Sequence, residues 1–180
     1  MSISPDRLVF VTGGSGSGQS AFAEQQVVDS GIARRIYLAT MEAYGEDGRA
    51  RVERHRALRE GQGFERVERT VDLSGLSLPN RCAVLVEDLT NLFANEWFSV
   101  APDGAAERVL EGVFHLTRQA ALTVVVGNDL FRDGAEYADM ETAAYLSALS
   151  ELNSALCADA EEVWEVVCGI PICLKKEERA

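Results

Sequence analysis

The sequence contains few lysines and few histidines, and these shortages limit the ligands that it can bind. Only two lysines and two histidines occur among 180 residues, whereas aspartate and glutamate together number 29. The formal net charge of -12 argues against general binding of nucleic acid or of anionic membranes, because either would approach against the field of the whole protein. An anionic ligand therefore requires a local basic or hydrogen-bond-donating site.

Cysteines and long apolar runs are scarce as well. The four cysteines include no C-x-x-C pair, and only two histidines are present to complete a metal site with them. We expect reduced core thiols at Cys82, Cys157, Cys168 and Cys173. The N-terminal run "LVFV" spans four residues, too few for a signal peptide or a membrane span. We therefore expect a cytoplasmic protein.

Short apolar runs alternate with helical patterns along the chain. Runs typical of buried strands occur at residues 7–12, 35–40, 83–88, 121–127 and 162–175, the last broken by Gly169 and Pro171. Helical patterns occur from Ser20 to Gly31 and around residues 47–60, 89–98, 105–120 and 139–157. This alternation predicts a single α/β domain over residues 1–180, with three layers and a mostly parallel sheet. Ligands of such sheets bind at the carboxyl ends of the strands.

A glycine loop follows the first predicted strand. The stretch "VTGGSGSGQSAFAEQ" (residues 11–25) matches the phosphate-binding pattern G-x-x-x-x-G-K-[ST] except at its lysine. In such a loop, backbone N–H groups and the following helix N-terminus form an anion cradle, and the terminal serine reaches a magnesium ion. The residues predicted to bind nucleotide phosphates are Gly13, Gly14, Ser15, Gly16, Ser17, Gly18, Gln19 and Ser20.

Gln19 occupies the lysine position of this pattern. An amide retains a hydrogen-bond donor but lacks the charge that neutralises developing charge on transferring phosphate oxygens. Loss of one such group typically costs about 3 kcal/mol, or on the order of 100-fold in rate. The only lysines, Lys175 and Lys176, lie near the C-terminus, so arginine is the better substitute.

Seven of the fifteen arginines lie between positions 49 and 69. On a helix, Arg51, His55 and Arg59 share one face, where guanidinium groups disfavour imidazole protonation and attract phosphate. A neutral imidazole is the nucleophilic form. The alternative for this cluster is a solvated face of an amphipathic helix.

Two acids end the predicted strand at residues 83–88. In phosphate-loop proteins an acid at a strand's carboxyl end holds magnesium, but it can equally cap the next helix. We assign Glu87 to the metal, together with Ser20, and Asp88 to the cap of the helix that follows.

The segments "FVTGGSGSGQS", "RVERHRALRE", "VLVEDLTNLFAN", "VVVGND" and "GIPICLK", in this order, resemble the bifunctional adenosylcobinamide kinase and adenosylcobinamide-phosphate guanylyltransferase family of cobalamin biosynthesis. The resemblance covers nearly the whole chain. Its most specific parts are R-V-x-x-H-R-x-x-R and G-I-P-x-x-L-K, since the glycine loop is generic.

The resemblance implies a P-loop α/β enzyme that uses GTP or ATP with Mg²⁺ and assembles as a trimer. It implies that His55 takes GMP from GTP and passes it to adenosylcobinamide phosphate, and that the same enzyme phosphorylates the corrinoid adenosylcobinamide. It also implies that Arg59, Glu68 and Glu87 lie in the guanine-nucleotide site.

The sequence departs from the family in three places. Gln19 replaces lysine, "GNDLFRDGAEY" replaces a glycine-rich N-E-V-G-x-G segment, and residues 133–174 carry nine acids without an arginine or lysine. These departures favour a second hypothesis, a nucleotide-binding pseudoenzyme with a structural or regulatory role, whereas His55 favours the enzyme. The segment "RVERHRALRE" argues against a third, a small-molecule kinase unrelated to cobinamide.

Overall fold

The chain opens with a strand, a glycine loop and a helix. The computed structural model describes residues 7–41, 61–130 and 139–177. Strand β1 (Arg7–Gly13) runs into helix α1 (Gln19–Asp29), and β2 (Arg34–Ala39) follows. The apolar residues of β1 are buried on both faces, as its continuous hydrophobic run predicts. The predicted order of strand, glycine loop, helix and strand is therefore confirmed.

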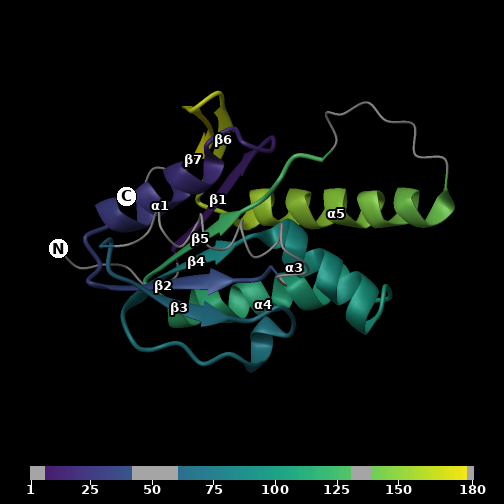
Figure 1. Ribbon diagram of the computed structural model, residues 1–180, viewed down its shortest axis with the longest axis horizontal. Coiled ribbons are helices and arrows are strands. Elements are labelled where there is room, and N and C mark those ends of the chain that lie inside the picture. The colour runs from purple at the N-terminus through teal and green to yellow at the C-terminus, as the bar shows by residue number, and fades with distance from the viewer. Residues whose placement is uncertain (1–6, 42–60, 131–138, 178–180) are drawn as a thin grey trace.

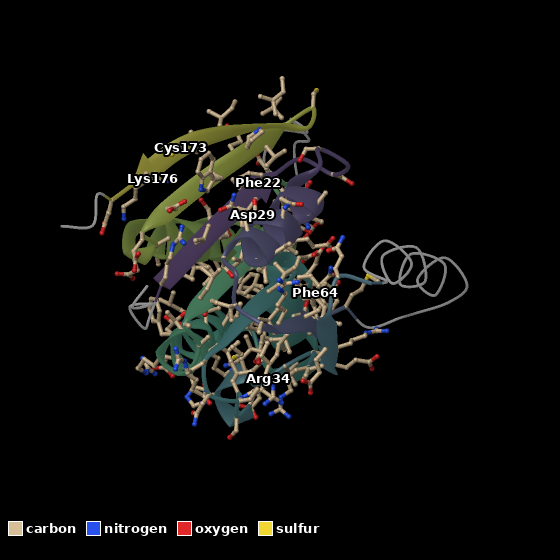
Figure 2. All side chains as sticks on the ribbon, turned by 90° about the vertical axis from the view of Figure 1, so that its left-hand side faces the viewer. Phe22, Asp29, Arg34, Phe64, Cys173 and Lys176 are labelled. Carbon is tan, nitrogen blue, oxygen red and sulfur yellow. The ribbon has the colours of Figure 1, made fainter. Side chains whose placement is uncertain are left out.

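Seven strands form one sheet in the order β3-β2-β4-β5-β1-β6-β7. The remaining strands are β3 (Phe64–Glu68), β4 (Cys82–Glu87), β5 (Leu122–Val126), β6 (Glu162–Val167) and β7 (Ile170–Lys176). All neighbouring pairs are parallel except β6 and β7, which form an antiparallel hairpin. Figure 2 shows the two edges of this sheet, with Cys173 on β7 at one edge and Phe64 on β3 at the other.

Described helices cover both faces of the sheet (Figure 1). Helix α1 packs on one face, over a cluster that includes Val11, Leu85 and Val124. The other face carries α3 (Leu89–Asn95), extended by the π-helical turn η2 (Glu96–Val100), together with α4 (Ala105–Gln119) and α5 (Met140–Asp159). The predicted three-layer α/β architecture, with a mostly parallel sheet, is confirmed.

Three expectations differ from the structure. Strand β3 was not among the predicted strands, because "FERVE" is a polar edge strand without an apolar run. In the last predicted strand the chain turns at Cys168 and Gly169, but Pro171 lies within β7, since an edge strand tolerates a residue without an N–H group. Cys168 and Cys173 are exposed rather than in the core, because the hairpin ends the sheet.

The remaining boundaries agree to within a few residues. The predicted helix around residues 47–60 lies outside the described residues. Among the described helices, none combines the length and apolar character that crossing a membrane requires.

Candidate functional site

The glycine loop connects β1 to α1 and presents the start of that helix. Gly16 and Gly18 have φ of 75° and 96°, a region that glycine enters without the steric penalty of a Cβ atom. Gly18 is the N-cap of α1, so no side chain of the cap residue covers the helix end. The first N–H groups of a helix have no intrahelical acceptor, and at α1 no cap side chain accepts from them.

The β6–β7 turn closes the loop from the side. Gly169 N–H donates to Ser17 O at 2.8 Å, and Ser17 N–H donates to Gly14 O at 3.0 Å. A Cβ atom on Gly13 would lie 2.3 Å from Ser17 Oγ and 2.7 Å from the carbonyl oxygen of Val166. The loop is therefore fixed by packing, and the Ser17 amide is already engaged within it.

Gln19 is buried and belongs to a chain of side-chain hydrogen bonds. Ser17 Oγ donates to Gln19 Oε1 at 2.7 Å, and Gln19 Nε2 donates to Asn128 Oδ1 at 2.8 Å. Asn128 Nδ2 then donates to Asp88 Oδ2 at 3.2 Å. In this series of hydrogen bonds the amides of Gln19 and Asn128 each accept through oxygen and donate through nitrogen. The series ends on the carboxylate of Asp88. Gln19 thus joins the ends of β1, β5 and β4.

Asp88 caps helix α3, as predicted. Its Oδ1 accepts from Asn91 N at 2.7 Å, and its Oδ2 accepts from Asn91 Nδ2 at 2.8 Å. Burial raises the pKa of Asp88, and the hydrogen bonds from Asn91 and Asn128 oppose that rise. Burial, followed by the charge of Asp88, raises the pKa of Tyr145 on α5 to about 12. Asp88 therefore caps α3 and also accepts the hydrogen bond from Asn128, which connects it to Gln19.

The structure brings Glu68 and Glu87 to one level of the sheet. Both pair in register with Ala39, Glu68 from β3 and Glu87 from β4, so their backbones lie about 10 Å apart on either side of β2. Glu87 is buried, whereas Glu68 is exposed and forms an ion pair with Arg66 at 3.0 Å. The register with Ala39 places both on the α1 face, since Ala39 belongs to the α1-side cluster.

The predicted site residues thus gather at the carboxyl edge of the sheet. Gly13 ends β1, Glu68 ends β3 and Glu87 ends β4. The predicted His55 and Arg59, and with them the shared face with Arg51, lie outside the described residues.

Two polar residues at this edge were not assigned a role from sequence. Asn128 lies two residues after the end of β5, and Thr40 follows β2 directly. Thr40 N–H donates to Glu87 O at 3.1 Å, and Thr40 Oγ1 donates to Asp88 O at 2.7 Å. A polar residue within two positions of the end of a buried strand is the signal that could have identified both.

Ser20 and Glu87 have the oxygen ligands that Mg²⁺ prefers. Ser20 is half-buried in the first turn of α1, and Glu87 ends β4. Magnesium commonly takes one or two protein oxygens and completes its shell with phosphates and water. The described ranges contain no group of three or more histidines, cysteines or acids that could hold a metal ion. The donor set fits a magnesium ion shared with a nucleotide rather than a permanent metal site.

Known structures support the fold alone. A Pyrococcus horikoshii OT3 protein superposes with a TM-score of 0.58 at 10% identity, covering 97% of this chain and 88% of the other. A solved ATPase domain superposes with a TM-score of 0.52 at 10% identity, covering 89% of this chain and 69% of the other. The chain therefore has a P-loop α/β fold.

Sequence comparison identifies the family. The bifunctional adenosylcobalamin biosynthesis protein CobU of Escherichia coli (strain K12) is 28% identical, and that of Salmonella typhimurium (strain LT2) is 27% identical. Each alignment covers 93% of this chain and 99% of the relative. The pattern of one family, described as cobinamide kinase / cobinamide phosphate guanyltransferase, matches residues 9–174. With most of its length matched, the chain belongs to the cobinamide kinase / cobinamide phosphate guanyltransferase family.

Proposed function

We propose that this protein binds a guanine nucleotide with magnesium and transfers GMP, through His55, to adenosylcobinamide phosphate in cobalamin biosynthesis. The observation that carries the proposal is the uncapped first turn of α1, which lies at the same sheet edge as Glu68 and Glu87 in a chain that matches this family. The cradle supplies neutral N–H donors, which suit phosphate even where the whole protein is acidic.

In the proposed guanylyl transfer, neutral His55 attacks the α-phosphorus of GTP. A nitrogen–phosphorus bond forms, the bond to the α,β-bridging oxygen breaks, and pyrophosphate leaves. A phosphate oxygen of adenosylcobinamide phosphate then attacks the same phosphorus and releases His55. Magnesium held by Ser20 and Glu87 would offset charge on the leaving group. The loop amides hold the remaining phosphate oxygens in place.

The proposed kinase reaction depends more heavily on position 19. There the hydroxyl oxygen of adenosylcobinamide attacks the terminal phosphorus of a nucleoside triphosphate, GTP or ATP. The bond to the β,γ-bridging oxygen breaks, the nucleoside diphosphate leaves, and the hydroxyl proton passes to solvent. Negative charge builds on the transferring oxygens next to the loop, where a lysine would neutralise it. Gln19 lacks that charge, and its Nε2 is bonded to Asn128. We infer that phosphoryl transfer is the slower of the two reactions in this protein.

The second candidate is a nucleotide-binding pseudoenzyme with a structural or regulatory role. The hydrogen bonds from Ser17 to Gln19 and from Gln19 to Asn128 favour it, because they hold the residue at the lysine position without supplying a charge. Both candidates predict nucleotide binding, but only the enzyme predicts covalent guanylylation.

Calorimetric titration with GTP, with and without magnesium, tests the shared part of the proposal. We expect magnesium to tighten binding in the wild-type protein and to have little effect in Ser20→Ala and Glu87→Gln. Ser150→Ala is the matched control, because it makes the same chemical change at an exposed position of α5, outside the proposed site. Equal magnesium dependence in all four proteins would contradict the assigned metal ligands.

A further inference from the structure

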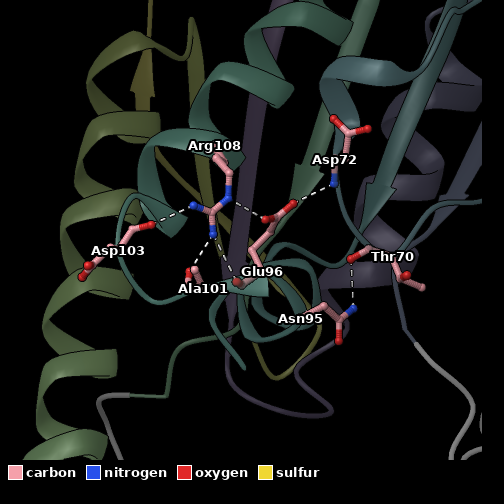
Figure 3. Close-up of polar contacts among 7 residues, drawn as sticks. All are labelled: Thr70, Asp72, Asn95, Glu96, Ala101, Asp103 and Arg108. Carbon is pink, nitrogen blue, oxygen red and sulfur yellow. Dashed lines mark hydrogen bonds and ion pairs between the residues drawn. The ribbon is translucent and has the colours of Figure 1, made fainter. Parts of the chain in front are cut away.

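Asn95, the last residue of α3, joins the ends of two strands. Its Nδ2 donates to Thr40 O at 2.9 Å and to Thr70 O at 3.1 Å, and Figure 3 shows the second of these bonds. Thr40 directly follows β2, and Thr70 lies two residues after the end of β3. One amide group therefore sets the spacing between the chain that leaves β2 and the chain that leaves β3.

The contacts of Thr40 extend this connection to β4. Thr40 is fully buried, and its N–H and Oγ1 groups donate to the carbonyl oxygens of Glu87 and Asp88. Through Asn95 and Thr40, the carboxyl ends of β2, β3 and β4 form one hydrogen-bonded unit. These are the strands whose ends carry Glu68 and Glu87.

Glu96 fixes the backbone next to Asn95. Its Oε1 accepts from Asp72 N at 2.7 Å, and its Oε2 accepts from Arg108 Nε at 2.8 Å (Figure 3). The Arg108 guanidinium also donates to the carbonyl oxygens of Glu96, Ala101 and Asp103. Glu96 is buried, and both of its oxygens are hydrogen-bonded, so α3 and η2 form a rigid support for the Asn95 amide.

We propose that Asn95 is a positioning residue of the nucleotide site. It fixes the chain just after β3, the strand that carries Glu68, relative to the ends of β2 and β4, which carry Thr40 and Glu87. It touches neither nucleotide nor metal, and it acts through the two carbonyl groups that it holds. This inference rests on the proposed function, since the groups that it positions are those assigned to the guanine nucleotide.

The chemistry requires an amide at this position. A single NH₂ group can donate to two carbonyl oxygens, whereas a carboxylate of the same size has no donor. Asn95→Asp therefore removes both hydrogen bonds with little change in volume. Asn95→Ala removes the bonds together with the side-chain packing, so agreement between the two variants assigns the effect to hydrogen bonding.

Two ligands separate positioning from general stability. Inorganic tripolyphosphate without magnesium uses only the glycine loop, which Asn95 does not touch, whereas GTP with magnesium also uses Glu68 and Glu87 at the strand ends. In Asn95→Asp and Asn95→Ala we expect GTP affinity and the rate of His55 guanylylation to fall about tenfold each, with tripolyphosphate affinity unchanged within about twofold. Leu156→Ala is the matched control, because it removes a fully buried side chain of α5 and leaves the hydrogen bonds of Asn95, Thr40 and Glu96 in place. It should lower thermal stability without changing the preference for GTP over tripolyphosphate.

The outcomes are distinguishable. GTP affinity and guanylylation within twofold of wild type in both Asn95 variants would overturn the inference, as would an equal loss of affinity for both ligands. If wild-type protein takes up no GMP on His55, the proposed function fails, and the positioning role falls with it.

Discussion

Gln19 Nε2 donates to Asn128 Oδ1 at 2.8 Å, across 109 residues of sequence. The residue at the lysine position is therefore held by a partner at the end of β5, and its oxygen is occupied by Ser17. The side chain at the usual lysine position is therefore neutral and hydrogen-bonded through both its oxygen and its nitrogen. This arrangement explains how the loop keeps its shape without the usual charge.

The first prediction concerns Gln19→Lys. We expect phosphoryl transfer to adenosylcobinamide to rise by roughly 100-fold, because an ammonium at this position stabilises charge that develops during transfer. Nucleotide affinity should rise less, since backbone amides and magnesium already hold the ground-state phosphates. Guanylylation should respond less than the kinase reaction, because it takes place at a different phosphorus. Steady-state turnover and equilibrium binding measure both effects.

Gln19→Met is the control for this change. Methionine breaks the bonds to Ser17 and Asn128 without adding charge, so turnover should not rise. If lysine tightens nucleotide binding but leaves turnover at background, the altered segment after Asn128 has removed the substrate site, and the pseudoenzyme hypothesis is preferred.

The second prediction compares two neighbouring glycines. Gly13→Ala places a Cβ atom 2.7 Å from the Val166 carbonyl oxygen, which belongs to β6, a strand that pairs with neighbours on both sides and cannot move freely. Gly14→Ala meets no atom within 4 Å. We expect Gly13→Ala to lower the free energy of unfolding by about 3 kcal/mol and Gly14→Ala to change it by less than about 1 kcal/mol. Urea denaturation tests this, and similar losses in the two variants would contradict the close packing of the loop on β6.

The third prediction concerns pH. Burial by itself raises the pKa of Glu162, but the hydrogen bond from Trp164 Nε1 and the charge of Arg7, with which Glu162 forms an ion pair, outweigh burial and lower it. A carboxyl whose pKa is lower in the folded protein contributes stability above its unfolded pKa and loses it as pH falls through the folded value. Glu162→Gln should cost about 1 kcal/mol at neutral pH.

This difference between Glu162→Gln and wild type should shrink as the pH falls below the ordinary glutamate value of 4.5. Glu151→Gln, at an exposed position of α5, is the control and should show no such trend. Unfolding free energies measured across this pH range decide the matter, and a constant difference would contradict the ion pair between β1 and β6.

The sequence predicted the elements with strong apolar periodicity and the loop with a strong local motif. Strands β1, β4 and β5 are buried on both faces, so their runs are unbroken, and the glycine spacing located the loop before α1. Strand β3 was not predicted, because it is a polar strand at the sheet edge and contains no run of buried apolar residues. The cap role of Asp88 could be predicted because its partner Asn91 is three residues away.

Long-range partners could not be predicted in this way. The bond between Gln19 and Asn128 depends on β5 lying next to β1, and the bonds of Asn95 depend on β2 and β3 being neighbours. Sequence spacing carries no information on such pairs until the strand order is known. For the same reason, the register of Glu68 and Glu87 against Ala39 emerged only from the structure.

The proposed activity requires this protein to carry GMP on His55. Incubation of wild-type protein and His55→Ala with α-labelled GTP and magnesium, followed by mass mapping of the labelled peptide, tests this requirement most directly. We predict label on the wild-type protein that resists alkali, is released by acid as a phosphoramidate must be, and maps to His55, with none on His55→Ala. Wild-type protein that binds GTP but acquires no covalent label would contradict the proposal and leave the nucleotide-binding pseudoenzyme as the account of this chain.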